Sequence, residues 1–229
     1  MVSSDRTWAA ALMERRRQRY WSYSPVFWRP ASGVTALHAG FLGSQIARDD
    51  VVAFRTGSGF VMGETRGGEG FIDDFAVEPD KQWEGDGRRL LAAAWERLHA
   101  YGALTVRVVS AQKDLPKNTL LSSVGLSVAD EWWVKALVPS GRSDKRGTVR
   151  GSGFSGYLGP APPVYDPGGD LLLVRYIDPE VPVDDMERQA ASWGAVLAVV
   201  PAVPDGARAR ELSTNGYEVA SQWFVGVPA

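Results

Sequence analysis

The chain has 229 residues, a formal net charge of −2 at pH 7 and no cysteine. This length supports one large or two small domains with a buried core, while the charge balance gives no basic field for nucleic acid. The lack of cysteine excludes disulfides, thiol nucleophiles and thiolate metal sites, and two histidines leave little for metal catalysis.

No run approaches the roughly 18 consecutive apolar residues of a membrane span. The N-terminus lacks the order of a signal peptide, because its basic cluster follows its apolar run. We therefore expect no membrane partner and a cytoplasmic protein. The abundance of Ala, Gly, Arg and Trp over Lys is typical of a high-GC bacterial source.

The N-terminal third predicts two helices, over residues 5–20 and 34–47. The basic run Arg15–Arg17 is assigned to a surface face of the first, and His38 to the surface of the second rather than to a base. The segment 20–30 is dense in aromatics and proline, and either plugs a core or lines a substrate pocket; packing is the favoured alternative.

Three strands follow, over residues 51–55, 59–64 and 70–77, and the Gly-rich turns between them predict an antiparallel meander. The third strand leads through a polar segment, 82–87, into an amphipathic helix over 88–100. Beyond it we expect a strand at 104–109, a helix at 116–124 that ends at Gly125, and a strand at 127–138.

The polar segment has the pattern Gln82-x-x-Gly85-x-Gly87. Two glycines one residue apart let a ligand approach the main chain, and a helix start directs N–H groups at an anion. A dinucleotide fingerprint needs a small residue where Leu90 stands, and a P-loop needs a Gly-Lys-Ser/Thr that never occurs. The segment therefore predicts a different kind of pyrophosphate site.

Together with Val77 and Pro79 before it, this pattern resembles the acyl-CoA signature of the GNAT superfamily of N-acyltransferases. The resemblance in element order covers roughly residues 20–138. It implies an α/β (α+β) fold with a mixed, mostly antiparallel central sheet flanked by helices, and acetyl-CoA (CoA) as the cofactor.

By that resemblance, the end of the third strand holds the pantetheine arm and the amides of the loop hold the pyrophosphate. Asp114 and Lys117 stand where the family has an asparagine and an alanine in the following helix. Glu84 and Asp86 are a departure, because such loops usually carry basic residues; Arg88 and Arg89 are placed to offset this acidic charge. The predicted cofactor-binding residues are Ala76, Val77, Gln82, Trp83, Gly85, Asp86, Gly87, Arg88, Asp114 and Lys117.

Candidate bases are Asp73 and Asp74 on the third strand and Glu78 at its end. Adjacent strand residues face opposite sides, so we expect only one aspartate to face the acceptor cleft. The resemblance favours Asp74, which either pairs with the incoming ammonium or removes its proton.

The position of the family's tyrosine acid holds Leu121. Either the thiolate leaves unassisted, or Ser122, Ser123, Tyr20 or Tyr23 substitutes, or the chain does not catalyse the usual reaction.

The C-terminal part carries echoes of the first. Residues 193–196 (WGAV) resemble 101–104 (YGAL), and the next glycine follows after 22 residues instead of 23. We assign a GNAT acyl-CoA-binding domain to 1–138, a linker to 139–169 and a degenerate GNAT-like half-domain to 170–229. Without a glycine pair, this copy is expected to complete the sheet, support the first copy or wall the acceptor pocket.

The predicted function is an acetyl-CoA-dependent N-acetyltransferase for a primary amine of a small molecule or peptide. The alternative is a catalytically silent GNAT-fold module that binds acyl-CoA or a partner protein; a purely structural protein is a third class. We expect no nucleic-acid partner and leave a homodimer open. Candidate residues of an acceptor pocket are the aromatics Trp21, Tyr23, Phe27, Trp28 and Trp132.

Overall fold

The computed structural model describes residues 1–141 and 145–228. Residues 142–144 of the predicted linker and residue 229 of the predicted half-domain lie outside the described part. The chain divides into two compact units. The first comprises Met1–Arg19, Gly33–Ala129 and Gln222–Ala229, and the second Tyr20–Ser32 and Asp130–Ser221.

The first unit has the predicted order of helices and strands, with boundaries shifted by a few residues. Its strands run in the order β1-β2-β3-β4-β10. Its elements are α1 (Arg6–Tyr23), α2 (Val34–Ile46), β1 (Val51–Arg55), β2 (Gly59–Arg66), β3 (Glu69–Val77), α3 (Arg88–Ala100), β4 (Thr105–Ala111), α4 (Leu115–Ser123), and parts of β5 (Ser127–Ala136) and β10 (Glu218–Gly226).

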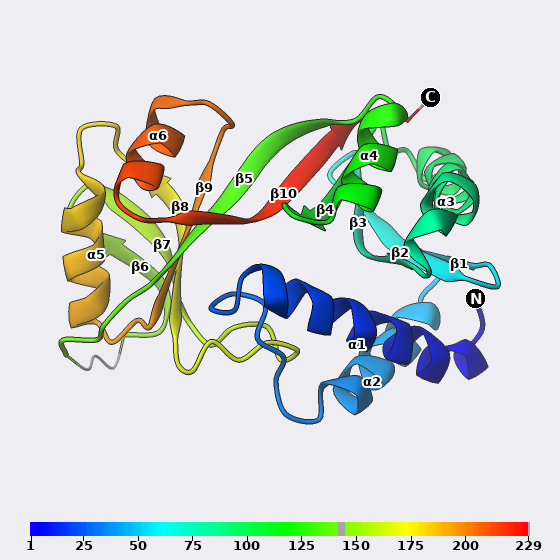
Figure 1. Ribbon diagram of the computed structural model, residues 1–229, viewed down its shortest axis with the longest axis horizontal. Helices are drawn as coiled ribbons and strands as arrows, with labels where there is room; N and C mark the ends of the chain where they lie inside the picture. The colour runs from blue at the N-terminus through cyan, green and yellow to red at the C-terminus, as the bar shows by residue number, and fades with distance from the viewer. Residues whose placement is uncertain (142–144, 229) are drawn as a thin grey trace. The chain divides into compact units, whose positions relative to one another are not determined.

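Helices cover both faces of this strand layer, α1 and α2 on one side and α3 and α4 on the other (Figure 1). Alternation along β2 builds the two cores, because Phe60 and Met62 pack against α1 and α2 while Val61 packs against α3 and α4. Burial on both faces explains why β2 and β3 are more continuously apolar than a strand with one wet face.

β3 carries the two irregularities that shape the unit. Asp74 pairs with Met62 and Ile72 with Gly63, so Asp73 is an extra residue in a β-bulge. On the other edge, β3 runs parallel to β4 only as far as the pair Ile72 and Val108. Beyond that pair the two strands part.

The second unit contains β6 (Gly147–Gly151), β7 (Phe154–Gly159), β8 (Leu171–Ile177), α5 (Val183–Ser192), β9 (Leu197–Ala202) and α6 (Ala207–Thr214). The prediction of a linker over 139–169 was wrong for the part that forms the β6–β7 hairpin. Its many glycines misled the prediction: Gly147 and Gly153 adopt positive φ at the hairpin, and Gly156 packs against β8, where Leu173 leaves no room for a Cβ.

The internal repeat is confirmed in backbone detail. Gly102, Gly125, Gly194 and Gly216 all adopt positive φ, between 79° and 92°, after a helix. The residue after each glycine donates its N–H five residues back, as Ala103 does to Leu98 at 3.0 Å and as its counterpart in the second copy does at 3.1 Å.

The second copy also keeps the bulge. Gly156 pairs with Val174 and Ser155 with Tyr176, so Arg175 is the extra residue in β8. The last strand of each copy passes into the other unit: β9 pairs with β5 of the first copy, and β4 lies beside β10 of the second. The predicted boundaries at 138 and 170 therefore differ from the units observed.

The aromatic segment after α1 packs inside the second unit, which favours the packing alternative. Phe27 contacts Trp28 edge-on, with ring centroids 4.6 Å apart, and Trp132 at 6.2 Å. Trp28 donates its indole N–H to the carbonyl of Ala220 at 3.1 Å. Trp21 is exposed.

Candidate functional site

The bulge in β3 brings Asp73 and Asp74 to one cavity of about 110 Å³ in the first unit. A regular strand would point them to opposite faces, so the expectation that only one faces the cleft was wrong. The cavity is lined by Phe41, Gln45, Val51, Met62, Gly63, Glu64, Arg66, Phe71, Asp73 and Asp74.

Asp74 is held from behind by His38 on α2. The Nε2 atom of His38 lies 3.1 Å from the carboxylate of Asp74, and its Nδ1 atom lies 2.7 Å from Arg17 on α1. A guanidinium only donates, so Nδ1 accepts and Nε2 carries the proton donated to Asp74. His38 is only 3 % exposed, so its assignment to the helix surface was wrong.

Asp73 is the carboxylate of the pair that reaches solvent. Desolvation by the surrounding protein, and after it repulsion from Asp74, raise the pKa of Asp73 from 3.8 to about 6. The charges of Lys117 and Arg66 act in the opposite direction. The two carboxylates therefore differ, one fixed by a histidine and one poised to take up a proton near neutral pH.

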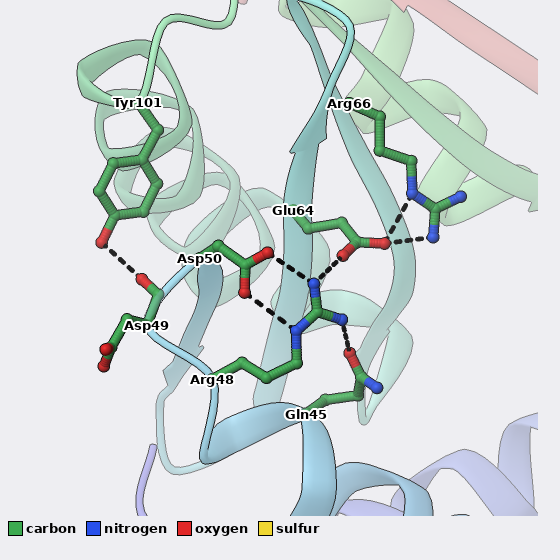
Figure 2. A network of polar contacts seen from close by, with 7 residues as sticks. All are labelled: Gln45, Arg48, Asp49, Asp50, Glu64, Arg66 and Tyr101. Carbon is green, nitrogen blue, oxygen red and sulfur yellow. Dashed lines mark hydrogen bonds and ion pairs between the residues drawn. The ribbon is translucent and has the colours of Figure 1, made fainter.

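The rim of the cavity is a neutralised network (Figure 2). Arg48 donates to both oxygens of Asp50, at 2.9 and 2.6 Å, and to Glu64 at 2.8 Å. Arg66 donates to the other oxygen of Glu64 at 2.6 Å. Since Glu64 is satisfied by two arginines, Asp73 and Asp74 carry the negative charge available to a ligand.

Glu78 lies outside the cavity. Its carboxylate accepts from Arg15 Nε on α1 at 2.6 Å. Of the three candidate bases, the structure brings Asp73 and Asp74 together and leaves Glu78 apart.

The glycine segment is more helical than expected. A 3₁₀ turn at Asp80–Gln82 and a π-helical turn at Trp83–Gly87 run directly into α3. The N–H of Trp83 donates to Asp80, and that of Arg88 donates to Gly85 and Trp83. We expected the amides from Gln82 to Arg88 to face a pyrophosphate. The N–H groups of Trp83 and Arg88 instead form hydrogen bonds within the helical turns.

The two glycines have different surroundings. A Cβ on Gly85 would meet nothing nearer than the side-chain oxygen of Gln82, at 3.7 Å, so this side of the backbone is open. A Cβ on Gly87 would lie 2.7 Å from the ring of Trp83 and 3.0 Å from Leu120. Gly87 therefore makes room for a buried tryptophan, while Gly85 leaves the main chain accessible.

Both acidic residues of the segment are paired. Asp86 accepts from the Ser58 hydroxyl and from Arg89, and these two bonds, in that order, lower the pKa of Asp86 to about 2. Glu84 accepts from Arg88 at 3.1 Å. The arginines thus offset the acidic departure from the family pattern.

Lys117 fills the gap where β3 and β4 part. Its ammonium donates to the carbonyl of Val109 on β4 at 2.7 Å and to that of Phe75 on β3 at 3.3 Å. Phe75 also presents its ring to the ammonium, which lies 5.3 Å from the centroid. The side chain of Lys117 is buried although it ends in a charge.

A second buried charge closes the neighbouring space. Arg16 on α1 forms an ion pair with Asp114 at the start of α4, and its guanidinium lies 4.7 Å from the ring centroid of Trp83. Trp83 contacts Phe75 edge-on at 4.9 Å. Four elements of the first unit thus meet in a stack of cations and aromatic rings.

The assignment of Arg15–Arg17 to a surface face was wrong for two of its members. Arg16 and Arg17 are each 2 % exposed. They lie one helical turn after Leu12 and Met13, which pack in the core, and that i, i+4 spacing was the available signal.

Among the described residues, no group of three or more His, Asp or Glu side chains is arranged to hold a metal ion. In the same residues, no helix has both the length and the apolar character needed to cross a bilayer.

Each unit contains antiparallel strands, a parallel crossover and a bulged strand, and in the first unit the bulge lies beside an acidic cavity. The chain has the fold of the GNAT acetyltransferases, in a two-part architecture.

Solved structures with this fold cover most of the chain. A protein from Pyrococcus horikoshii assigned as an acetyltransferase is 11 % identical, with a TM-score of 0.56 over 100 % of this chain and 88 % of its own. One from Thermoplasma acidophilum is 12 % identical, with a TM-score of 0.55 over 86 % and 90 %. A GCN5-related N-acetyltransferase from Sphaerobacter thermophilus is 10 % identical, with a TM-score of 0.54 over 83 % and 86 %. No protein-family model and no curated protein matches the chain.

The residues present fit coenzyme A in part. The open side of Gly85 leaves the main chain accessible to a diphosphate, while Arg88 and Arg89 balance the charges of Glu84 and Asp86. The resemblance places the pantetheine arm along the end of β3, where the ammonium of Lys117 donates to Phe75 and Val109, so the arm would fit there only when this side chain moves away.

Proposed function

We propose that the protein is an acetyl-CoA-dependent N-acetyltransferase that acts on a primary amine of a small molecule or peptide in the cytoplasm. The observation that carries this proposal is the carboxylate pair Asp73 and Asp74, which lines a cavity on the bulged strand of a GNAT fold. The strand that bears the pair is also the strand that parts from β4.

The cavity suits an ammonium group rather than a large neutral ligand. About 110 Å³ has room for a few water molecules or for an ammonium and its first methylenes. The rings of Phe41 and Phe71 line it beside the two carboxylates, and aromatic faces attract cations.

Asp74 and Asp73 then have separate roles. Asp74, fixed by His38, holds and orients the ammonium. Asp73, whose pKa is raised to about 6, accepts one proton from it and leaves the neutral amine that acyl transfer needs. Acetyl-CoA would supply the acetyl group as a thioester. Leu121, at the position of the family's tyrosine, is a buried core residue and donates no proton.

The test is thiol release from acetyl-CoA with a panel of primary amines. Turnover should fall at least tenfold in Asp73→Asn and in Asp74→Asn, since an enzymatic general base contributes a factor of about 100 or more. Asp49→Asn is the matched control, because this exposed residue contributes only its backbone carbonyl to the network of Figure 2. Equal loss in all three variants would contradict the assignment.

A catalytically silent module is the second candidate, supported by the inward-facing Trp83 and Lys117. It predicts that CoA binding, where calorimetry detects it, is not followed by turnover on any amine, and that Asp74→Asn changes nothing. Turnover that depends on Asp73 and Asp74 would exclude this candidate.

A further inference from the structure

We infer that Lys117 is an internal occupant of the path for the acyl-CoA arm and sets the affinity of the first unit for CoA. The inference rests on the proposed use of acyl-CoA. Removal of the Lys117 side chain should strengthen the binding of CoA. Removal of a side chain that holds the cofactor should instead weaken it.

The parted strands explain why something must fill the gap. After the pair Ile72 and Val108, the facing main-chain groups of β3 and β4 no longer bond to each other. Buried carbonyls need partners, and an extended ligand between parted strands is one way to supply them. Lys117 donates hydrogen bonds to one carbonyl on each strand, at Phe75 and Val109. It thereby satisfies carbonyls that an extended ligand between the strands would otherwise satisfy.

The side chain has both the shape and the charge for this role. Its four methylenes fill a buried channel between the parted strands, and its ammonium donates to the two carbonyls. The ring faces of Phe75 and Trp83 lie 5.3 and 6.0 Å from the ammonium. Alanine, which the family resemblance implies at this position, would leave both the channel and the carbonyls open.

Lys117 is also the movable member of the stack. Arg16 is tied to Asp114 by a buried ion pair, and Trp83 lies between Arg16 and Phe75. A lysine side chain, by contrast, rotates about several bonds and can change position without moving backbone. Displacing it costs its two carbonyl bonds, and that cost must be subtracted from the binding of any arm that takes its place.

Two variants separate the filling of the channel from the charge. Lys117→Ala opens the channel, while Lys117→Met keeps a chain of similar length without donors. Lys113→Ala is the matched control, because Lys113 is exposed four residues earlier. Calorimetry with CoA should show about tenfold or more tighter binding for Lys117→Ala. Lys117→Met loses the two carbonyl bonds but keeps the bulk, so it should bind CoA more tightly than the wild type and less tightly than Lys117→Ala. Lys113→Ala should match the wild type.

A second readout uses the wild-type chain. Acetylation of lysines by N-acetoxysuccinimide, followed by peptide mass spectrometry, should leave Lys117 unmodified and modify Lys113. At saturating CoA the amine of Lys117 should become reactive, while Lys113 stays unchanged. This readout decides the matter if Lys117→Ala fails to fold.

A folded Lys117→Ala that binds CoA no more tightly than the wild type overturns the inference, as does a Lys117 that remains protected at the highest CoA concentration. The proposed function is judged separately. If the wild type turns over and Lys117→Ala has no effect on CoA binding, the proposed function is supported and the role of Lys117 is contradicted. If Lys117→Ala binds CoA more tightly but no variant turns over, the role of Lys117 is supported and the proposed function is contradicted.

Discussion

Replacing each glycine of the helical turn by alanine tests whether Gly85 and Gly87 have the separate roles seen in the structure. Both positions are helical, so both gain about 0.5–1 kcal/mol from the lower backbone entropy of alanine in the unfolded chain. Only Gly87 faces packed side chains. Its new Cβ would stand 2.7 Å from Trp83 and 3.0 Å from Leu120, while that of Gly85 meets nothing within 3.4 Å.

The expected difference is the cost of overpacking alone, because the gain in propensity is common to both variants. Inserting a methyl group into a packed core costs about 1–3 kcal/mol. Trp83 has little freedom to move, since Arg16 lies over its ring and Phe75 packs against it in a T-shaped contact. We expect Gly85→Ala to melt at or above the wild-type temperature and Gly87→Ala to melt several degrees lower, at about 2–4 °C per kcal/mol for a chain of this length.

The measurement is thermal and urea unfolding of the wild type and the two variants, followed by tryptophan fluorescence. CoA titration of the same proteins adds the functional comparison, because bulk at Gly85 meets the open side proposed for a diphosphate. Melting temperatures that agree within about 1 °C, or a Gly87→Ala variant more stable than Gly85→Ala, would refute the packing role of Gly87.

Three further predictions concern other parts of the chain. His38→Ala should cost about 2–4 kcal/mol in urea unfolding, because Arg17 and Asp74 lose a shared buried partner; a loss below about 0.5 kcal/mol would contradict the bridge. Asp73→Asn should be more stable than the wild type at pH 7. Because the pKa of Asp73 is raised from 3.8 to about 6, its ionisation lowers the stability of the wild type as the pH rises through that window. In a series of melting experiments, the difference in stability between the two proteins should therefore vanish near pH 4. Gly194→Ala should cost about 1–2 kcal/mol, since its φ of 89° is left-handed; an unchanged melting temperature would show that the cap is dispensable.

Periodicity and glycine position were enough to predict the order of elements in the first unit. The helix expected over 88–100 has those bounds in the structure, and the bounds of the strands differ by two residues at most. The repeat was predictable because a helix that ends in a left-handed residue constrains the sequence to glycine, as at Gly102 and Gly194. A backbone conformation that few residue types adopt can therefore be predicted from the sequence alone.

The interior of the site was not predictable, because it depends on contacts between distant elements. The bulge at Asp73 arises from pairing with β2, and strand alternation alone gives the opposite answer. Lys117 and Arg16 have side chains that are exposed in most proteins, and their burial follows from partners 42 and 98 residues away along the chain, at Phe75 and Asp114. The glycine pair led to the prediction of a ligand-binding loop, because no local sequence signal indicates that the side chain of Trp83 is buried.

The repeat itself argues that any chemistry belongs to one copy. The parallel pairing of Glu69 with Thr105 in the first copy corresponds to that of Leu171 with Leu197 in the second, so the bulged residues Asp73 and Arg175 occupy equivalent positions. The second copy therefore keeps the backbone device that redirects two side chains but presents a cation and a tyrosine in place of two carboxylates. A bulge without carboxylates offers no acceptor for a proton from an ammonium, and a like charge repels it. Arg175→Asp should accordingly leave amine acetylation by the protein unchanged, and an increase in turnover in this variant would show that the second copy has retained a working site.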